Sequence, residues 1–227
     1  VLLDTNHHSQ LNTQQAREVT EFYQKLIKEG YTVPSMGTAN ASTTGPYLDN
    51  FANGKTGMII MANWWESALS DTMGDDFKYI KTAPIPIGPS GDSSHSVSYS
   101  WLTVVNKKST SEQQKAAWEF LKWLNSEQSG KNGSSAMGDI LMGMGIIPSR
   151  TSDIEAHQDK LNSPFIKTYV DELKNAKPFP IVLAGNELTT NIQKKLESME
   201  FGQSDAGSVM KDIHQMVNDL MDQNYNQ

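Results

Sequence analysis

The spacing of apolar residues along the chain predicts several amphipathic helices. Between residues 13 and 29, apolar side chains recur every three or four positions; Asn12 or Thr13 can cap the start, and Gly30 ends the pattern. The same spacing predicts a helix over 111–125. Further helical patterns cover 46–53, 64–73, 127–136, 152–159, 163–175, 186–200 and 205–223. The chain is therefore expected to be rich in helix.

Patterns typical of β-strands are fewer and lie mostly in the first half. An apolar run over 57–62 predicts a strand, the segment 77–83 predicts another, and the alternating residues of 96–106 predict a long one. Segments 34–46 and 137–149 are expected to be connections, and the prolines of 83–91 exclude regular structure there. A helix-rich α/β chain with so few strands is expected to form an incomplete sheet.

The predicted strand 57–62 ends abruptly at the sequence N-W-W, and the helix 64–73 follows at once. Asn63 is a good helix N-cap. Open α/β sheets bind ligands where strands hand over to helices, and a flat indole face suits the C–H face of a sugar ring. Because neighbours on a helix diverge by about 100°, either Trp64 or Trp65 can line a cleft while the other packs inward. The alternative is that both pack in the core.

A second aromatic pair lies on the predicted strand 96–106. Tyr99 and Trp101 are two residues apart and therefore share one face of a strand. Either ring is a candidate for a ligand site. By contrast, Trp118 and Trp123 lie beside an apolar stripe on the helix 111–125 and are expected to pack as core or half-buried residues. That stripe, expected to be buried, consists of Ala116, Ala117, Phe120, Leu121 and Leu124.

Composition narrows the classes of function. The net charge of −7 and the scattered lysines argue against nucleic acid as a partner. The sequence contains no apolar run of about 18 residues, so direct membrane insertion is not predicted. The chain has no cysteine, which excludes disulfides, thiol nucleophiles and cysteine metal sites. Its start, V-L-L-D, resembles neither an initiator methionine nor a signal peptide, so the sequence is expected to be part of a longer one.

Several motifs were tested as catalytic or metal sites and lack a necessary element. The run G-K-T at 54–56 resembles the end of a P-loop, but Asp49 stands where the first glycine is required. The adjacent His7 and His8 point apart on any regular element and are expected to be exposed. No carboxylate pair is singled out for catalysis. Arg150 is expected to lie in an exposed turn or a salt bridge. No metal, cofactor or catalytic residue is therefore predicted.

Five motifs, in order, resemble the extracellular solute-binding proteins of ABC transporters, in the carbohydrate-binding group that includes maltose-binding protein. Residues 51–58, F-A-N-G-K-T-G-M, resemble the family's F-x-x-G-K-x-A-M, and six residues later Trp64 falls on its cleft tryptophan. Residues 83–89 resemble its proline-rich turn, 107–124 its K-x-S…A-x-x-F-L-x-x-L helix, and 145–150 its G-x-x-P-x-R turn. Ala62 replaces a common glycine, and Tyr99 and Ser100 replace residues that are often small.

The resemblance implies an α/β, periplasmic-binding-protein-like fold of two lobes, of which this chain would be roughly the C-terminal half. Residues 1–101 would be the first part of the C-terminal lobe, with the cleft loop and hinge strand. Residues 102–154 would be the returning segment of the N-terminal lobe, and 155–227 the helical remainder of the C-terminal lobe. Without the rest of the N-terminal sheet, the apolar face of the helix 111–125 is expected to be poorly buried, or covered by a neighbouring chain.

The implied function is binding of an extracellular sugar or oligosaccharide between the lobes, and its delivery to the permease of an ABC importer. The protein would be a cell-surface lipoprotein or periplasmic, and not an enzyme. Trp64 would stack on a sugar ring, with further contacts from Asn63, Trp65, Glu66, Ser98, Tyr99, Ser100 and Trp101. Two alternatives stay open: a carbohydrate-active hydrolase domain, and a binding protein for a solute other than a sugar.

Overall fold

The computed structural model describes residues 2–34 and 46–225, so most of the predicted connection 34–46 lies outside the described residues. The chain forms two compact units. Unit 1 comprises Val1–Phe51, Pro86–Val97 and Lys177–Gln227, and unit 2 comprises Ala52–Ile85 and Ser98–Ala176. These boundaries differ from the segments 1–101, 102–154 and 155–227. Those segments refer to the lobes of a two-lobe protein, and they stay a prediction.

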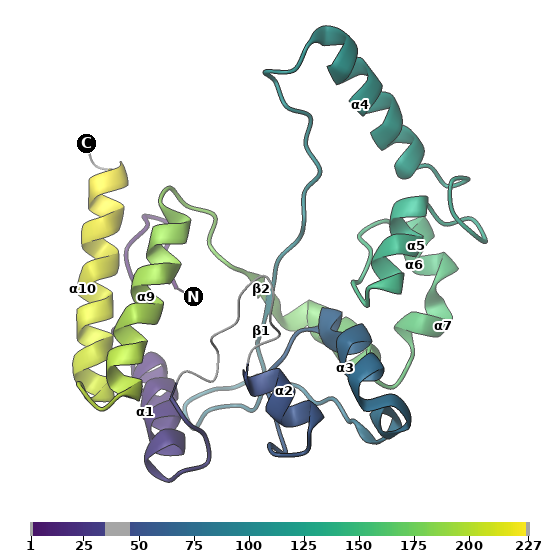
Figure 1. Ribbon diagram of the computed structural model, residues 1–227. Helices are drawn as coiled ribbons and strands as arrows, with labels where there is room; N and C mark the ends of the chain where they lie inside the picture. The colour runs from purple at the N-terminus through teal and green to yellow at the C-terminus, as the bar shows by residue number, and fades with distance from the viewer. Residues whose placement is uncertain (1, 35–45, 226–227) are drawn as a thin grey trace. The chain divides into compact units, whose positions relative to one another are not determined.

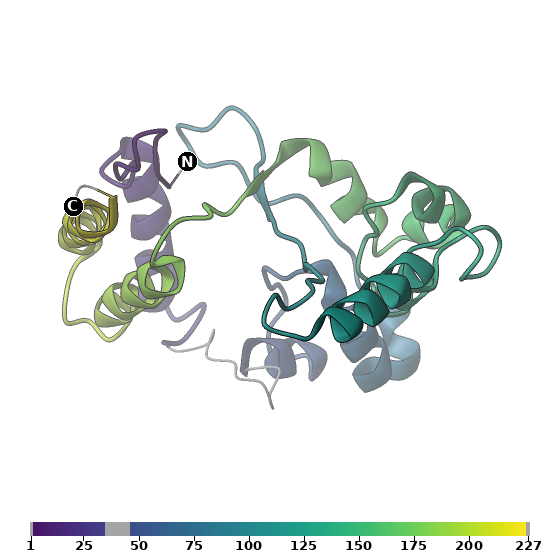
Figure 2. The ribbon, with the colours of Figure 1, turned by 90° about the horizontal axis from the view of Figure 1, so that it is seen from above.

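Unit 1 is built on three long helices that lie side by side in both ribbon views (Figures 1 and 2): α1 (Gln14–Lys28), α9 (Gly185–Glu200) and α10 (Ala206–Tyr225). They confirm the helices predicted over 13–29, 186–200 and 205–223. Thr13 caps α1 by accepting a hydrogen bond from the Ala16 amide. The buried core of this unit consists of Leu3, Leu188, Met199, Ala206, Val209, Met210, Ile213, Val217, Leu220 and Met221.

Hydrogen bonds between distant parts of the chain reinforce unit 1. The Tyr23 hydroxyl on α1 donates to the Glu200 carboxylate at 2.7 Å. The backbone amide of Ser9 donates to the Asn218 side chain of α10 at 2.8 Å. The short helix α2 (Pro46–Ala52) confirms the helix predicted over 46–53 and ends at the boundary between the units.

Unit 2 is an assembly of short helices. Its first part has η1 (Asn63–Trp65), α3 (Glu66–Met73) and η2 (Gly74–Tyr79), and its second part begins with α4 (Ser111–Leu124) and α5 (Ala136–Gly143). Then come α6 (Thr151–Ala156), α7 (Gln158–Leu161), α8 (Lys167–Glu172) and η3 (Leu173–Asn175). The helices predicted over 64–73, 152–159 and 163–175 are therefore present but broken into pieces. The buried apolar side chains of unit 2 are Leu69, Leu124, Met142, Leu161, Phe165 and Ile166.

The prediction for 127–149 was wrong, because the helix lies later than expected. Residues 127–135 are turns, in which Asn132 and Gly133 have left-handed φ values of 54° and 86°. Such a backbone ends helical structure. Ser135 then caps α5 by accepting a hydrogen bond from the Gly138 amide at 2.9 Å, so the helix begins where a connection was predicted.

The predicted strands are mostly wrong. Among residues 2–34 and 46–225, the only sheet has two strands, β1 (Ser96–Ser98) and β2 (Ala176–Pro178), and the boundary between the units falls within both. Residues 57–62 are irregular, 77–79 belong to η2, and 99–106 form no strand. Met58 is 88% exposed and Leu102 is 83% exposed. A β-prone run becomes a strand only when another strand pairs with its backbone, and these runs have no such partner in the described part of the chain.

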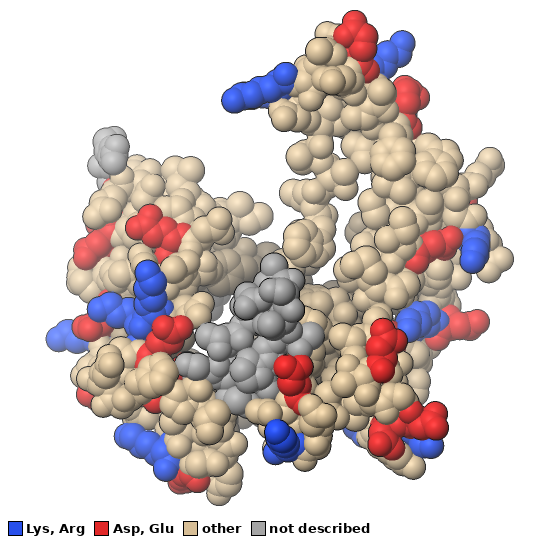
Figure 3. Space-filling view, in the orientation of Figure 1, with Lys and Arg blue, Asp and Glu red and all other residues tan. Residues whose placement is uncertain are grey.

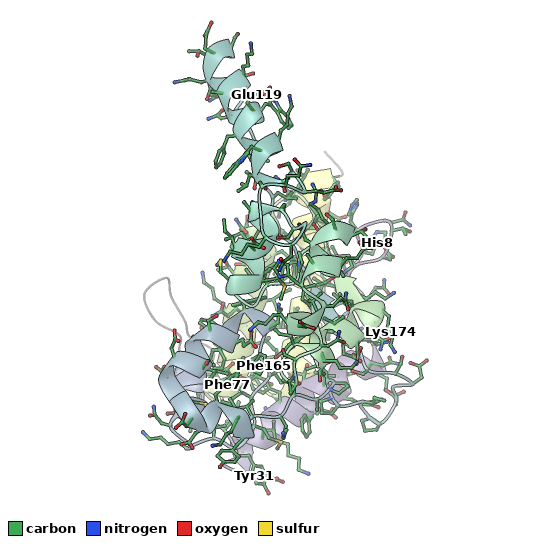
Figure 4. The ribbon with its side chains drawn as sticks, turned by 90° about the vertical axis from the view of Figure 1, so that its right-hand side faces the viewer. His8, Tyr31, Phe77, Glu119, Phe165 and Lys174 are labelled. Atoms are coloured by element: carbon green, nitrogen blue, oxygen red, sulfur yellow. The ribbon has the colours of Figure 1, made fainter. Side chains whose placement is uncertain are left out.

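Helix α4 begins as predicted but does not bury its apolar stripe. Thr110 and Gln113 form a capping box at its start. Of the predicted stripe only Leu124 is buried, and Phe120 is 56% exposed. Trp118 and Trp123 are 57% and 55% exposed, so the expectation that they pack as core or half-buried residues was wrong. Figure 4 shows α4, marked by Glu119, projecting from the rest of unit 2. The poor burial expected for this face is what the structure shows.

A buried polar cluster connects α5 and α6 in unit 2. Asp153 is 2% exposed and accepts hydrogen bonds from the backbone and the hydroxyl of Ser135, at 2.6 and 2.8 Å. A Cβ on Gly138 would lie 2.5 Å from the carboxyl carbon of Asp153, so glycine is required there. The Arg150 guanidinium lies 3.7 Å from this carboxylate and donates to the Asn125 carbonyl. For Arg150, the salt bridge is therefore the correct alternative.

The surface carries both signs of charge. On the face of the described residues drawn in Figure 3, basic and acidic side chains are interspersed rather than gathered by sign. In the described part of the chain, no helix combines the length and the apolar character that a membrane span requires.

His7 stacks on Tyr225 with ring centroids 3.9 Å apart.

Candidate functional site

Three aromatic side chains from two separate segments of unit 2 come together. The rings of Trp64 and Tyr99 meet edge to face with centroids 5.1 Å apart and an interplanar angle of 65°. Trp101 adds a second edge contact to Tyr99 at 6.5 Å and 69°. We call Trp64, Tyr99 and Trp101 the aromatic cluster. The sequence predicted these three rings as candidates, and the structure places them in contact.

The aromatic cluster is open to solvent. Tyr99 is 59% exposed and Trp101 is 78% exposed, whereas Trp64 is half-buried. Edge-to-face contacts use the rim of one ring and leave other ring faces free for a ligand. Partial burial raises the pKa of the Tyr99 hydroxyl above the ordinary value. Like any tyrosine, Tyr99 is protonated at neutral pH, so its hydroxyl can donate a hydrogen bond.

The turn that presents Trp64 is shaped differently from the prediction. Asn63 is not an N-cap but the first residue of η1, and the cap residue, Ala62, makes no side-chain capping bond. The Asn63 amide group instead donates to the Gly145 carbonyl at 2.6 Å. Asn63 therefore ties the turn to the segment after α5, and Trp65 is half-buried beside it.

Glu66 is also held by the protein. Its side chain is 8% exposed and forms an ion pair of 2.7 Å with the Lys160 ammonium of α7. Gly145 lies against it: a Cβ at Gly145 would be 3.3 Å from both Cβ and Oε2 of Glu66, and 3.1 Å from the Asn63 carbonyl. The two polar residues predicted beside Trp64 thus have partners inside the chain.

The Gly145→Ala substitution is expected to lower the free energy of unfolding by about 1–2 kcal/mol. Its left-handed φ of 73° is unfavourable for alanine, and the added methyl group would press on the turn. Gly143→Ala is the control, because an added Cβ there meets nothing within 4 Å. Urea unfolding of both variants measures the difference, and equal midpoints would contradict the close packing described for Gly145.

The remaining predicted residues flank the aromatic cluster. Ser98 is half-buried at the end of β1, and Ser100 is exposed between Tyr99 and Trp101. Both serines belong to the chain segment that carries the two exposed rings: Ser98 precedes Tyr99, and Ser100 precedes Trp101. Their roles toward a ligand stay a prediction.

A second anchor holds the chain just before the turn. The Tyr169 hydroxyl donates to the Met61 carbonyl at 3.4 Å, and its ring contacts Phe165, with centroids 5.7 Å apart. Phe165 in turn contacts Phe77 at 5.4 Å, and both are labelled in Figure 4. Burial raises the pKa of Tyr169 to about 12. No local pattern in the sequence predicts that α8 supports the turn.

Unit 2 is expected to lose stability in alkaline solution. An unfolded tyrosine ionises near pH 10, whereas folded Tyr169 stays neutral until about pH 12. The stabilisation is therefore fully present below pH 10 and is lost as the pH rises toward 12. We expect a loss of about 1–2 kcal/mol in this window, smaller in Tyr169→Phe. Urea unfolding between pH 8 and 12 measures it, and an identical pH profile for the variant would refute this assignment.

A cleft of about 600 Å³ belongs to unit 1 and is lined by residues at the ends of α1 and α9, including Lys28 and Phe201. A smaller cleft, of about 230 Å³, belongs to unit 2 and borders the ion pair of Glu66 and Lys160. The larger cleft shares no residue with the aromatic cluster. In the described ranges, no three metal-ligating side chains are grouped to hold an ion.

Comparisons with known proteins place this geometry in context. The sequence profile of bacterial extracellular solute-binding proteins matches residues 2–158, more than half of the chain. No curated protein sequence matches significantly. The profile match covers both segments of the aromatic cluster as well as the turn at Gly145.

Solved structures share the fold. The maltose-bound MalE3 of T. maritima has 21% identity and a TM-score of 0.75, and the match covers 97% of this chain and 54% of that one. The sugar-binding protein MalE of Xanthomonas citri has 18% identity and a TM-score of 0.72, with coverage of 98% and 53%. Lmo0181 of Listeria monocytogenes, in complex with cycloalternan, has 14% identity and a TM-score of 0.68, with 97% and 53%. The chain thus spans about half the length of these proteins. The matches confirm the predicted resemblance and fold class.

Proposed function

The chain belongs to the family of bacterial extracellular solute-binding proteins, and from this we propose that it binds a sugar or oligosaccharide and delivers it to the permease of an ABC importer. The observation that carries the proposal is the aromatic cluster, in which Trp64 contacts Tyr99 and Tyr99 contacts Trp101 at edge-to-face angles. A non-enzymatic role fits the solved relatives, which are named as a sugar-binding protein and a substrate-binding protein.

The physical basis is the amphipathic character of a pyranose ring. Its C–H faces are apolar and its rim carries hydroxyl groups, so a suitable site combines flat aromatic faces with hydrogen-bonding groups beside them. Trp64 supplies a half-buried, fixed face, and Tyr99 and Trp101 supply exposed faces at steep angles to their neighbours. The hydroxyls of Ser98 and Ser100 lie on the same segment and would bind at the rim.

The ligands of the solved relatives support a saccharide over other solutes. One of those proteins is bound to maltose, one is named as sugar-binding, and one is in complex with cycloalternan. Because their identity to this chain is 14–21%, their ligands suggest a class of compound rather than a particular sugar.

In the full-length protein, we expect the sugar to bind between two lobes that close around it. Closure is favoured only to the extent that the sugar binds the closed state more tightly than the open state. The closed form would then dock on the membrane permease, from the periplasm or the cell surface. Each buried hydroxyl left without a hydrogen bond would cost about 1–3 kcal/mol, and this penalty would set selectivity among sugars.

A thermal-shift panel on the full-length protein tests the proposal. Glucose, maltose and maltotriose are compared with leucine and inorganic phosphate, and the sugars are recovered afterwards and analysed. A rise in Tm that grows with the concentration of at least one saccharide is expected, because a hundredfold excess over Kd adds about 2.7 kcal/mol to the free energy of unfolding, and the sugar should be recovered unchanged. A shift with leucine or phosphate alone would replace the sugar with another solute, and cleaved sugar would indicate a hydrolase.

A further inference from the structure

The ion pair of Glu66 and Lys160 is unequal in its exposure. The Glu66 side chain is 8% exposed, whereas the Lys160 side chain is 43% exposed, and 2.7 Å separates their charged atoms. A carboxylate that is buried away from water needs a partner, because desolvation without pairing is costly. Lys160 is the cation that the structure places at Glu66 within the described residues.

Glu66 is fixed on a second side by the backbone of Gly145. The absence of a side chain at Gly145 leaves the room that Cβ and Oε2 of Glu66 occupy, and Asn63 donates to the carbonyl of the same glycine. The Ser67 hydroxyl also donates to the Gly143 carbonyl, at 3.4 Å. In sequence, Trp64 therefore lies between Asn63, whose side chain is bound to the Gly145 carbonyl, and Glu66, whose side chain is paired with Lys160.

The cleft of about 230 Å³ beside the ion pair offers Glu66 another position. Its walls include Ser67, Ser70, Asp71 and Phe77 in addition to the ion pair. Without the Lys160 ammonium, the Glu66 carboxylate would gain solvation by turning into this cleft. That movement would release its contact with Gly145 and shift the first turn of α3, which continues directly from η1 and Trp64.

We propose that Lys160 is a positioning residue: through Glu66 it fixes the orientation of Trp64 against Tyr99. The consequence for sugar affinity rests on the proposed function, whereas the effect on Trp64 itself does not. Lys160 does not touch the aromatic cluster, and α7 follows Trp64 by more than ninety positions in sequence, so this role is visible only in the fold.

The first test needs no ligand. The full-length protein is labelled with 5-fluorotryptophan, and the ¹⁹F resonance of Trp64 is assigned by its loss in Trp64→Phe. In Lys160→Met this resonance is expected to shift and broaden, and in Lys160→Arg to return to its original position. The matched control is Lys167→Met, which removes an exposed ion pair with Asp171 from α8. It is expected to leave the Trp64 resonance unchanged.

The second test is a double-mutant cycle of maltose affinity. Lys160→Met is expected to weaken binding about 3- to 10-fold, Lys160→Arg to restore it, and Lys167→Met to leave it unchanged. If Lys160 acts through Trp64, the double variant Lys160→Met, Trp64→Ala should bind no more weakly than Trp64→Ala alone. A purely structural role would instead give additive losses together with an earlier melt.

An unchanged Trp64 resonance in Lys160→Met would overturn the inference, as would additive losses in the cycle. Failure of the proposed function gives a different result, namely a protein that binds no saccharide while the Trp64 resonance still responds to Lys160→Met and not to Lys167→Met. Glu66→Gln is the second variant, and it should shift the same resonance, because it removes the charge that Lys160 holds.

Discussion

Replacing Trp64 with alanine is expected to weaken saccharide binding about 5- to 150-fold, which corresponds to about 1–3 kcal/mol. The loss follows from removal of the half-buried indole that the turn holds between Asn63 and Glu66 and that Tyr99 contacts at 5.1 Å. A fixed aromatic face costs little entropy to bring against a sugar ring, so its contribution to affinity should exceed that of the exposed Trp101. Calorimetric titration of the full-length protein with maltose measures the effect.

Trp118→Ala is the matched control for Trp64→Ala. Trp118 is 57% exposed on α4, so its removal is expected to change neither the affinity nor the free energy of unfolding by more than about 0.5 kcal/mol. This differs from what the sequence suggests, because a core tryptophan would cost about 3–5 kcal/mol. If Trp64→Ala bound maltose normally but melted early, Trp64 would be a core residue and the site would lie elsewhere.

The largest loss of stability is expected from Asp153→Ala, at about 2–4 kcal/mol. The substitution would leave the amide and the hydroxyl of Ser135 without their acceptor, in a place where Ser135 is fully buried. It would also leave the Arg150 guanidinium without its buried partner. Urea unfolding followed by circular dichroism measures the loss.

Asp171→Ala is the control for Asp153→Ala, since it removes an exposed carboxylate that pairs with Lys167 one helical turn away. Exposed pairs of this kind contribute at most about 0.5 kcal/mol. Equal effects of the two substitutions would show that the buried polar cluster does not stabilise unit 2.

The helices were predictable because their signals are local. Thr13 precedes the apolar spacing of α1, and Gly30 ends it with a left-handed φ of 76°, so both ends are encoded within a few residues. The exception, α5, shows the limit of such patterns. Asn132 and Gly133 have left-handed backbones, and the helix begins only after them, with Ser135 as its N-cap. Apolar spacing does not specify backbone conformation of this kind.

The strands could not be predicted, because pairing depends on residues that are distant in sequence. The run 57–62 and the residues after Ser98 have high β-propensity, but they have no partner strand in the described residues, and Met58, Ile60, Leu102 and Val104 stay exposed. The same reason explains α4: its amphipathic sequence forms a helix, yet burial of Phe120 needs another layer to pack against.

The candidate site was likewise predictable from local signals but not where it depends on residues distant in sequence. Trp64 was singled out by its place where a predicted strand meets a helix, and Tyr99 and Trp101 by sharing one face of a predicted strand, and the structure brings the three rings together. Asn63 and Glu66 were predicted to contact a ligand; in the structure their side chains bind Gly145 and Lys160, and a ligand role for either stays a prediction. The supporting residues Lys160 and Tyr169 give no local signal, since a lysine or tyrosine on a short helix is usually a surface residue.

Saturation-transfer difference NMR with maltose tests most directly whether the aromatic cluster binds a sugar. Irradiation of the aromatic protons of the full-length protein should transfer saturation mainly to the C–H protons on one face of a sugar ring. That transfer should be greatly reduced in Trp64→Ala and retained in Trp118→Ala. Saturable binding of maltose with the same transfer in Trp64→Ala as in the unsubstituted protein would contradict the account, because the sugar would then bind away from Trp64.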